Sequence, residues 1–148
     1  FDQYNFFVPA IAVREFTWNV FAAHYIEMAK ARAYGIGFSD AERDGAIFTL
    51  HKVLSTLLKL LAPIIPFITD FLWQTLYSEK SIHTEQQAKQ ESNEDLTSHT
   101  QAISEFNSKV WNEKKEKGLS LKDSIKTEIP KELEIFKKDL VAMHNLGS

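Results

Sequence analysis

Two prolines within a strongly apolar stretch constrain the fold of this chain more than any other feature. Residues 61–73 read L-A-P-I-I-P-F-I-T-D-F-L-W. Pro63 and Pro66 lack a backbone N–H, so they fit the end of one helix and the first turn of the next. The stretch therefore predicts a buried corner between two helices, with Asp70 as its one acid.

Helical patterns lie on both sides of this corner. A first-turn proline, apolar residues at helical spacing and a glycine stop predict a first long helix over 9–35. Ser39 and Glu42 form a capping box, which predicts a second helix over 40–62. A third helix is expected over 66–77. The second helix should face the core with Ile47, Leu50, Val53, Leu54, Leu57, Leu58 and Leu61.

The C-terminal third of the chain is also predicted to be helical, in shorter segments. Apolar residues at helical spacing predict a fourth helix that ends at Gly118, where a left-handed stop is natural. Residues 126–130, K-T-E-I-P, predict a short extended segment, and a last helix should follow. The sequence thus predicts an all-α helical bundle with a small C-terminal appendage. The apolar face of the last helix comprises Leu133, Phe136, Leu140 and Met143.

Charge divides the chain into three segments. Acids against bases number 7 against 6 over 1–78, 5 against 2 over 79–100, and 8 against 9 over 101–148. The middle segment contains a run, 85–95, without aromatic or β-branched residues, which buries too little surface to order easily. We predict a helical core over 1–78, a polar linker or loop over 79–100, and C-terminal helices of the same domain over 101–148.

Composition excludes several classes of protein. A chain of 148 residues with 44% apolar and 25% charged residues is globular. The absence of cysteine excludes disulfides and thiolate zinc sites. The longest apolar run, near 57–68, is shorter than the roughly 20 residues of a membrane span, so no membrane segment is predicted. Because the chain opens on Phe1 without an initiator methionine, we interpret it as part of a longer protein.

No pattern in the chain predicts catalysis or metal binding. Glu27 and Asp70 are single acids on separate helices and are interpreted as caps or partners of nearby cations. The G-I-G at 35–37 lacks the further glycine, strand and lysine of a phosphate loop. We therefore expect no catalytic residue and no metal ligand. The five histidines have neither metal-site nor triad spacing: His24, His51, His83, His99 and His144.

Two groups of aromatic and basic residues suit binding to unpaired bases and phosphates. The structural alternative is that Phe21 and Tyr25 of the first group are core and that the second group is a solvated lysine face. A net charge of -3 requires any nucleic-acid contact to come from a local patch. The first group is Trp18, Phe21, His24, Tyr25, Lys30 and Arg32, and the second is Lys109, Trp111, Lys114, Lys115 and Lys117.

Several ordered motifs resemble one protein family. The run F-T-W-N-V-F-A-A-H-Y-I-E-M-A-K over 16–30 is followed by the corner over 61–73 and by S-I-H over 81–83. This order is similar to the anticodon-binding domain of class I aminoacyl-tRNA synthetases for valine, isoleucine and leucine. The runs over 106–123 and 136–146 resemble the valine enzymes, in particular archaeal ones.

The chain departs from this family pattern at two places. Ala23 stands where the family carries an aspartate, so any contact made by that carboxylate is missing. After S-I-H the chain runs into the polar segment that begins at Thr84, where the family continues to a short apolar or Trp-Pro segment. The helical architecture is expected to survive both changes.

The resemblance implies a helical-bundle domain that binds the anticodon arm of tRNA(Val), within a cytoplasmic, monomeric parent that joins valine to tRNA. Neither H-I-G-H nor K-M-S-K-S occurs, so the sites for ATP and Mg lie outside this chain, which should be inactive alone. No cofactor, DNA or membrane partner is expected. The tRNA contacts that we predict are His24, Lys30, Arg32, Lys109, Trp111, Lys114 and Lys115.

Three alternatives to this interpretation stay open. The domain could belong to an isoleucine or leucine enzyme. It could be a helical protein-interaction module, with Trp18 and Trp111 forming the partner surface. It could also be a structural spacer that holds other domains. A titration with valine tRNA and an anticodon-altered control would separate RNA recognition from the last two.

Overall fold

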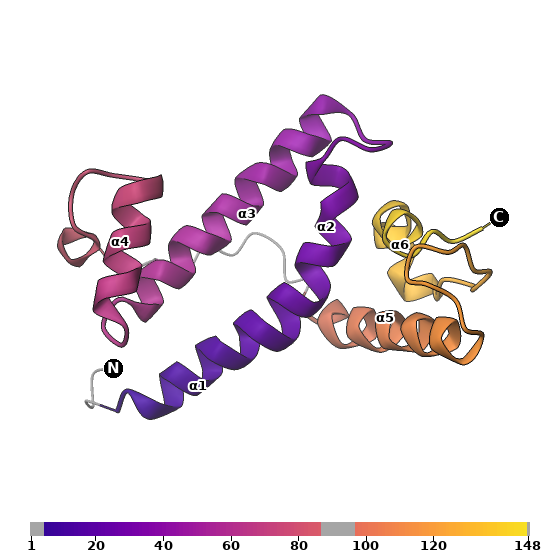
Figure 1. The fold of residues 1–148 in the computed structure, drawn as a ribbon, viewed down its shortest axis with the longest axis horizontal. Helices are drawn as coiled ribbons and strands as arrows, with labels where there is room; N and C mark the ends of the chain where they lie inside the picture. The colour runs from indigo at the N-terminus through magenta and orange to yellow at the C-terminus, as the bar shows by residue number, and fades with distance from the viewer. Residues whose placement is uncertain (1–4, 87–96, 148) are drawn as a thin grey trace.

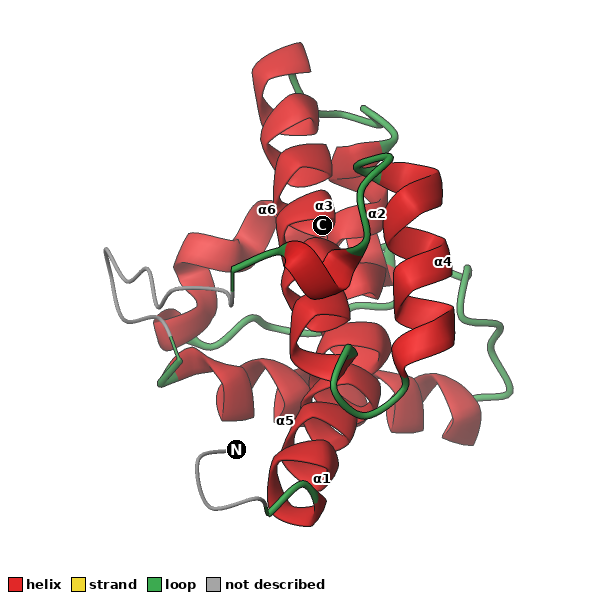
Figure 2. Ribbon diagram, turned by 90° about the vertical axis from the view of Figure 1, so that its left-hand side faces the viewer, coloured by secondary structure: helices red, strands yellow, loops and turns green. Residues whose placement is uncertain are grey.

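The computed structural model describes residues 5–86 and 97–147, and these residues are helical or loop almost throughout (Figures 1 and 2). The β structure within them is one parallel bridge between Ile125 and Leu146. The predicted all-α fold is confirmed. The elements are α1 Phe7–Glu15, η1 Phe16–Tyr25, α2 Ile26–Ala33, α3 Asp40–Leu61, α4 Pro66–Leu76, η2 Ile82–Thr84, α5 His99–Glu116, η3 Lys131–Phe136 and α6 Lys137–His144.

The helices are arranged on two sides of α2. Figure 1 shows α3 on one side of α2 and α5 with α6 on the other, while α4 packs near the far end of α3. The C-terminal segment thus returns to pack against the first part of the chain. This return brings residues of α5 next to η1 and residues of α6 next to α2.

The first helical rod contains a register that the sequence pattern does not predict. Between α1 and α2, η1 is a π-helix of 10 residues, and the N–H of Ile26 donates to the carbonyl of Phe21 five residues earlier. The rings of Phe16 and Phe21, also five residues apart, stack with centroids 6.3 Å apart. Phe21 stacks in turn on Tyr25 at 5.6 Å. The wider i→i+5 register is thus accompanied by a continuous stack of aromatic rings.

The turn into α3 follows the predicted capping box. The Ser39 hydroxyl accepts from the N–H of Glu42, and the Glu42 carboxylate accepts from the N–H of Ser39 at 2.8 Å. Gly35 and Gly37 adopt φ values of 70° and 77°, a left-handed backbone that suits glycine. The predicted helix over 40–62 is confirmed, but Ile47, expected to face inward, is 39% exposed.

The proline corner has the predicted geometry but not the predicted burial. Pro66 occupies the first turn of α4, and Ile65 before it has a non-helical backbone with φ -128° and ψ 66°. However, Phe67 is 90% exposed and Phe71 is 65% exposed, so the expectation of a buried corner is wrong for these side chains. The reason is that α4 packs on α3 through one face only. The corner core that results comprises Leu58, Ala62, Trp73 and Ile82.

A second core joins α2 to the C-terminal elements of the chain. Gly118 stops α5 with φ 66°, as predicted. The predicted last helix begins as the 3₁₀ segment η3 and continues as α6. Leu133 and Leu140 from these elements are fully buried. This C-terminal core comprises Met28, Phe106, Val110, Ile125, Leu133 and Leu140.

The predicted polar linker falls partly outside the described residues, since 87–96 are not described. Next to it, Ile82 is buried in the corner core, and Asp70 accepts hydrogen bonds from the Ser81 hydroxyl and the Ile82 N–H, each at 2.8 Å. These bonds lower the pKa of Asp70. Asp70 thus caps η2, while the division into three segments stays a prediction. Among the described helices, none has both the length and the apolar character needed to cross a bilayer.

Candidate nucleic-acid interface

The structure brings together two of the seven predicted contact residues from distant parts of the sequence. The imidazole of His24, on η1, stacks on the indole of Trp111, on α5, with ring centroids 5.5 Å apart and planes inclined by 24°. Both side chains are partly exposed. Trp111 is also held from a second direction, because the ring of His144 meets it edge-on at 5.8 Å.

A buried asparagine connects this aromatic pair to the protein interior. Asn107 is 0% exposed, and its amide nitrogen lies 3.2 Å from Nδ1 of His24. Its amide oxygen lies 2.8 Å from Nε2 of His144. The sequence reasoning missed Asn107 and His144 as site residues. A polar residue on the apolar face of a predicted helix, between Phe106 and Val110, is the signal that could have found Asn107.

Lys114 does not lie on the surface where it was expected. Its side chain is only 1% exposed, because position 114 lies on the core face of α5, one turn beyond Val110. The ammonium donates to the carbonyl oxygens of Leu121 at 2.6 Å and His144 at 2.8 Å. Lys114 therefore ties the chain after α5 to the end of α6, and this arrangement withdraws it from RNA.

Burial also sets the charge state of this network. Desolvation lowers the pKa of Lys114. Desolvation, together with repulsion from the Lys114 ammonium, lowers the pKa of His144 to about 4. Burial also lowers the pKa of His24. Both histidines are therefore neutral at pH 7, and each carries one ring proton.

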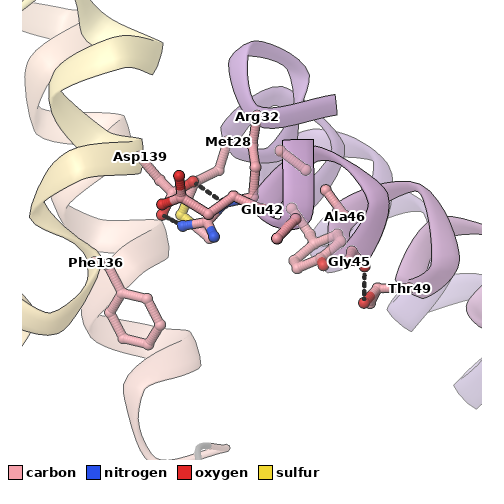
Figure 3. Close-up of a pocket in the computed structure, with 11 residues that line it drawn as sticks. Met28, Arg32, Glu42, Gly45, Ala46, Thr49, Phe136 and Asp139 are labelled. Carbon is pink, nitrogen blue, oxygen red and sulfur yellow. Dashed lines mark hydrogen bonds and ion pairs between the residues drawn. The ribbon is translucent and has the colours of Figure 1, made fainter. Parts of the chain in front are cut away.

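Arg32 is engaged in an ion pair within the protein. Its guanidinium donates to both carboxylate oxygens of Asp139, from Nε at 2.8 Å and from Nη2 at 2.5 Å. The pair joins α2 to α6 at the wall of a cavity of about 430 Å³, and Figure 3 shows the two side chains directed toward each other. Arg32 also lies over the ring of Phe38 at 4.8 Å. Because its donors are used by Asp139, Arg32 offers little to a phosphate.

The rim of the same cavity is likewise charge-balanced. Lys138 donates to Glu42 at 2.8 Å. Hydrogen bonds from Lys138 and Ser39 lower the pKa of Glu42 to about 2. The cavity and its rim thus contain two cations, Arg32 and Lys138, and two anions, Glu42 and Asp139. The cavity therefore lacks the positive excess that would attract an RNA backbone.

The remaining predicted lysines are exposed but point in different directions. Lys30 is paired with Glu27 at 2.6 Å, as the structural interpretation of Glu27 expected. Lys115 lies one turn after Trp111 and shares its side of α5. Lys109, two residues before Trp111, projects from nearly the opposite side. We call His24, Asn107, Trp111 and Lys115 the aromatic seam.

The described ranges also bear on metal binding. Within 5–86 and 97–147, no three His, Asp or Glu side chains are grouped so that they could hold a metal ion.

Comparison with known proteins gives consistent similarities. A family model described as the anticodon-binding domain of tRNA ligases matches residues 1–129. The valine–tRNA ligase of Pyrobaculum aerophilum is 38% identical over 130 residues, which cover 84% of this chain and 16% of that protein. The Nanoarchaeum equitans valine–tRNA ligase is 39% identical, covering 88% of this chain and 17% of that protein.

A third similar protein extends the comparison, and the solved structures add nothing to it. The valine–tRNA ligase of Methanothrix thermoacetophila is 41% identical over 136 residues, covering 90% of this chain and 15% of that protein. This chain thus spans about a sixth of the length of the curated relatives it matches. No solved structure matches it.

Proposed function

The chain belongs to the family of anticodon-binding domains of tRNA ligases, and we propose that it binds the anticodon arm of tRNA(Val). The observation that carries this proposal is the similarity to valine–tRNA ligases over 84% to 90% of the chain. The names of these relatives favour valine over isoleucine or leucine as the amino acid of the parent enzyme.

The proposal assigns the chemistry to the rest of the parent protein. The parent joins valine to its tRNA at the expense of ATP, with Mg bound in its catalytic part, and works as a monomer in the cytoplasm. This chain lacks the signature motifs of that catalytic part and supplies binding without catalysis. Its contribution is specificity, since bases that are unpaired in a loop expose their edges and faces to a protein.

The aromatic seam offers what such bases need. His24 and Trp111 present partly exposed ring surface for stacking, held in place by the buried Asn107 and His144. Lys115 adds an exposed cation on the same side of α5. Stacking on aromatics contributes roughly 1 to 3 kcal/mol per base, while lysines position phosphates without reading sequence. Lys30 and Lys109 stay proposed phosphate contacts outside the aromatic seam.

A binding titration tests this function. The 148-residue chain is titrated into a fluorescent RNA hairpin that carries the anticodon loop of tRNA(Val), at several salt concentrations, with a hairpin of altered anticodon as control. We expect tighter binding to the valine anticodon and an affinity that falls with salt. Equal affinity for both hairpins would contradict the proposal.

A lysine substitution sharpens the same titration. Lys115→Ala should lower the slope of log affinity against log salt by roughly 0.7, the value for one phosphate contact to single-stranded RNA. Lys80→Ala is the matched control, because Lys80 is exposed and lies two residues before Ile82 of the corner core, on a part of the chain that contributes nothing to the seam. A change in slope with Lys80→Ala but not with Lys115→Ala would move the interface to another face.

A further inference from the structure

The aromatic seam contains a chain of hydrogen bonds that ends at the surface. It starts at Nε2 of His144, passes through the amide of Asn107, and reaches Nδ1 of His24. His144 and Asn107 are buried, whereas His24 is partly exposed. Because an amide has a donating end and an accepting end, the chain has a direction.

The direction fixes which ring nitrogen of each histidine carries the proton. The Asn107 oxygen, 2.8 Å from Nε2 of His144, accepts the proton that this nitrogen carries. The Asn107 nitrogen, 3.2 Å from Nδ1 of His24, donates to that atom, which is therefore unprotonated. A neutral His24 must then carry its proton on Nε2.

The outer end of the chain is open. In the described part of the molecule, the one hydrogen bond of the His24 ring is at Nδ1, and Nε2 is not among the buried atoms that lack a partner. The His24 ring cannot turn freely, because it is bonded to Asn107 and stacked on Trp111. Trp111 is itself fixed by the edge of His144. The protein thus holds one N–H donor in a set orientation at the border of an aromatic surface, and little entropy is lost when a ligand accepts from it.

We propose that His24 is a specificity-determining residue that donates a hydrogen bond from Nε2 to an acceptor on an unpaired RNA base, and that Asn107 is the positioning residue that fixes this tautomer. The inference rests on the proposed function, because it names the chemistry by which the seam reads one anticodon base. A base with a carbonyl oxygen or an unprotonated ring nitrogen at that edge is accepted. A base that presents an N–H there is rejected, since two donors would face each other.

The first test needs no RNA. In the free chain at pH 7, ¹⁵N NMR of the imidazole rings distinguishes a protonated from an unprotonated ring nitrogen. We expect His24 to show a protonated Nε2 and an unprotonated Nδ1. The reversed amide orientation of Asn107 would place the proton on Nδ1, and that result would overturn the proposal.

A matched pair of His24 variants forms the second test. The amide nitrogen of His24→Gln reaches the position of Nε2 and keeps the outward donor, whereas His24→Asn reaches only the position of Nδ1 and loses it. For the valine-anticodon hairpin we expect His24→Asn to bind roughly 5- to 10-fold more weakly, the value of one hydrogen bond, and His24→Gln to stay within about threefold of the natural chain. Equal affinity of His24→Asn and the natural chain would overturn the proposal.

The base that His24 reads is found by combining this pair with hairpins in which each anticodon base is changed in turn. At one position the loss from the base change and the loss from His24→Asn should not add, because both remove the same hydrogen bond. Additive losses at every position would overturn the role of His24 in recognition.

Asn107→Asp supplies an independent check on the positioning role. A carboxylate accepts from both neighbours, so Nδ1 of His24 becomes protonated, and the ¹⁵N pattern of His24 should change while the fold persists by circular dichroism. If Asn107→Asp unfolds the chain, the proposal is judged from the His24→Asn and His24→Gln variants alone. Failure of the proposed function has a separate signature: the natural chain shows no salt-dependent hairpin binding at all. Binding by the natural chain with no effect of His24→Asn overturns this inference only.

Discussion

The two cores of this chain differ in how completely they are closed. In the C-terminal core Val110, Leu133 and Leu140 are fully buried, and its polar neighbours Asn107 and Lys114 have partners. In the corner core the indole N–H of Trp73 is buried without a hydrogen-bond partner among the described residues. Next to it, Phe67 and Phe71 remain largely exposed.

This difference shows that apolar content does not decide which part of a chain closes its own core. The corner is the more apolar stretch of the sequence, yet α4 packs on α3 through one face only, and the described residues leave its other face uncovered. The C-terminal core closes because α6 returns to α2, and the ion pair of Arg32 with Asp139 joins these helices. The aromatic seam lies along this closed core, where contacts with neighbouring side chains hold His24, Asn107 and Trp111 in place.

The largest expected difference in stability is between two alanine variants, one from each region. Leu140→Ala should lower the free energy of unfolding by about 2 to 5 kcal/mol, because it leaves a cavity in a fully packed site. Phe67→Ala should change it by less than about 0.5 kcal/mol, because this ring is already in solvent. Urea unfolding followed by circular dichroism measures both. Similar losses from the two variants would break the distinction between the cores.

A second comparison concerns two adjacent lysines on α5. Lys114→Met should cost about 1 to 3 kcal/mol of stability, since it removes the donor to the carbonyl of Leu121 and leaves the buried carbonyl of His144 without a partner. Lys115→Met, at an exposed position, should cost less than about 0.5 kcal/mol. The same urea series serves, and an equally small effect at both positions would show that Lys114 is not buried in solution.

The pH dependence of stability gives a third, smaller effect. The pKa of His144 falls from 6.5 to about 4 on folding, so the unfolded chain takes up a proton that the folded chain refuses. The stability due to neutral His144 is therefore complete above pH 6.5 and is lost progressively as the pH falls toward 4. Between pH 7 and pH 5 this loss amounts to about 2 kcal/mol. His144→Gln should remove this part of the pH dependence, and an unchanged profile in the variant would contradict it.

The elements of the fold were largely predictable from local signals. The capping box of Ser39 and Glu42, the first-turn Pro66 and the stop at Gly118 each act within one or two turns, and all three have the predicted geometry. The π register of η1 and the exposure of Phe67 were not predictable, because both depend on how whole helices pack.

The candidate site was predictable only in part, because it joins residues from different helices. His24 and Trp111 were named from their chemistry, but their stacking depends on η1 meeting α5. Residue type predicts an exposed Lys114 because lysine usually lies at the surface, whereas its position, which continues the apolar face of Phe106 and Val110, is buried. The partner of Arg32, Asp139, lies 107 residues away, beyond the reach of any local pattern.

The most direct test of the account follows the three indole N–H signals of the ¹⁵N-labelled chain, from Trp18, Trp73 and Trp111, as the valine-anticodon hairpin is added. The account predicts that the Trp111 signal shifts with the hairpin concentration, more strongly than with an altered-anticodon hairpin, while the Trp73 signal in the corner core stays in place. A shift of Trp73 with Trp111 unmoved, or identical shifts with both hairpins, would contradict it.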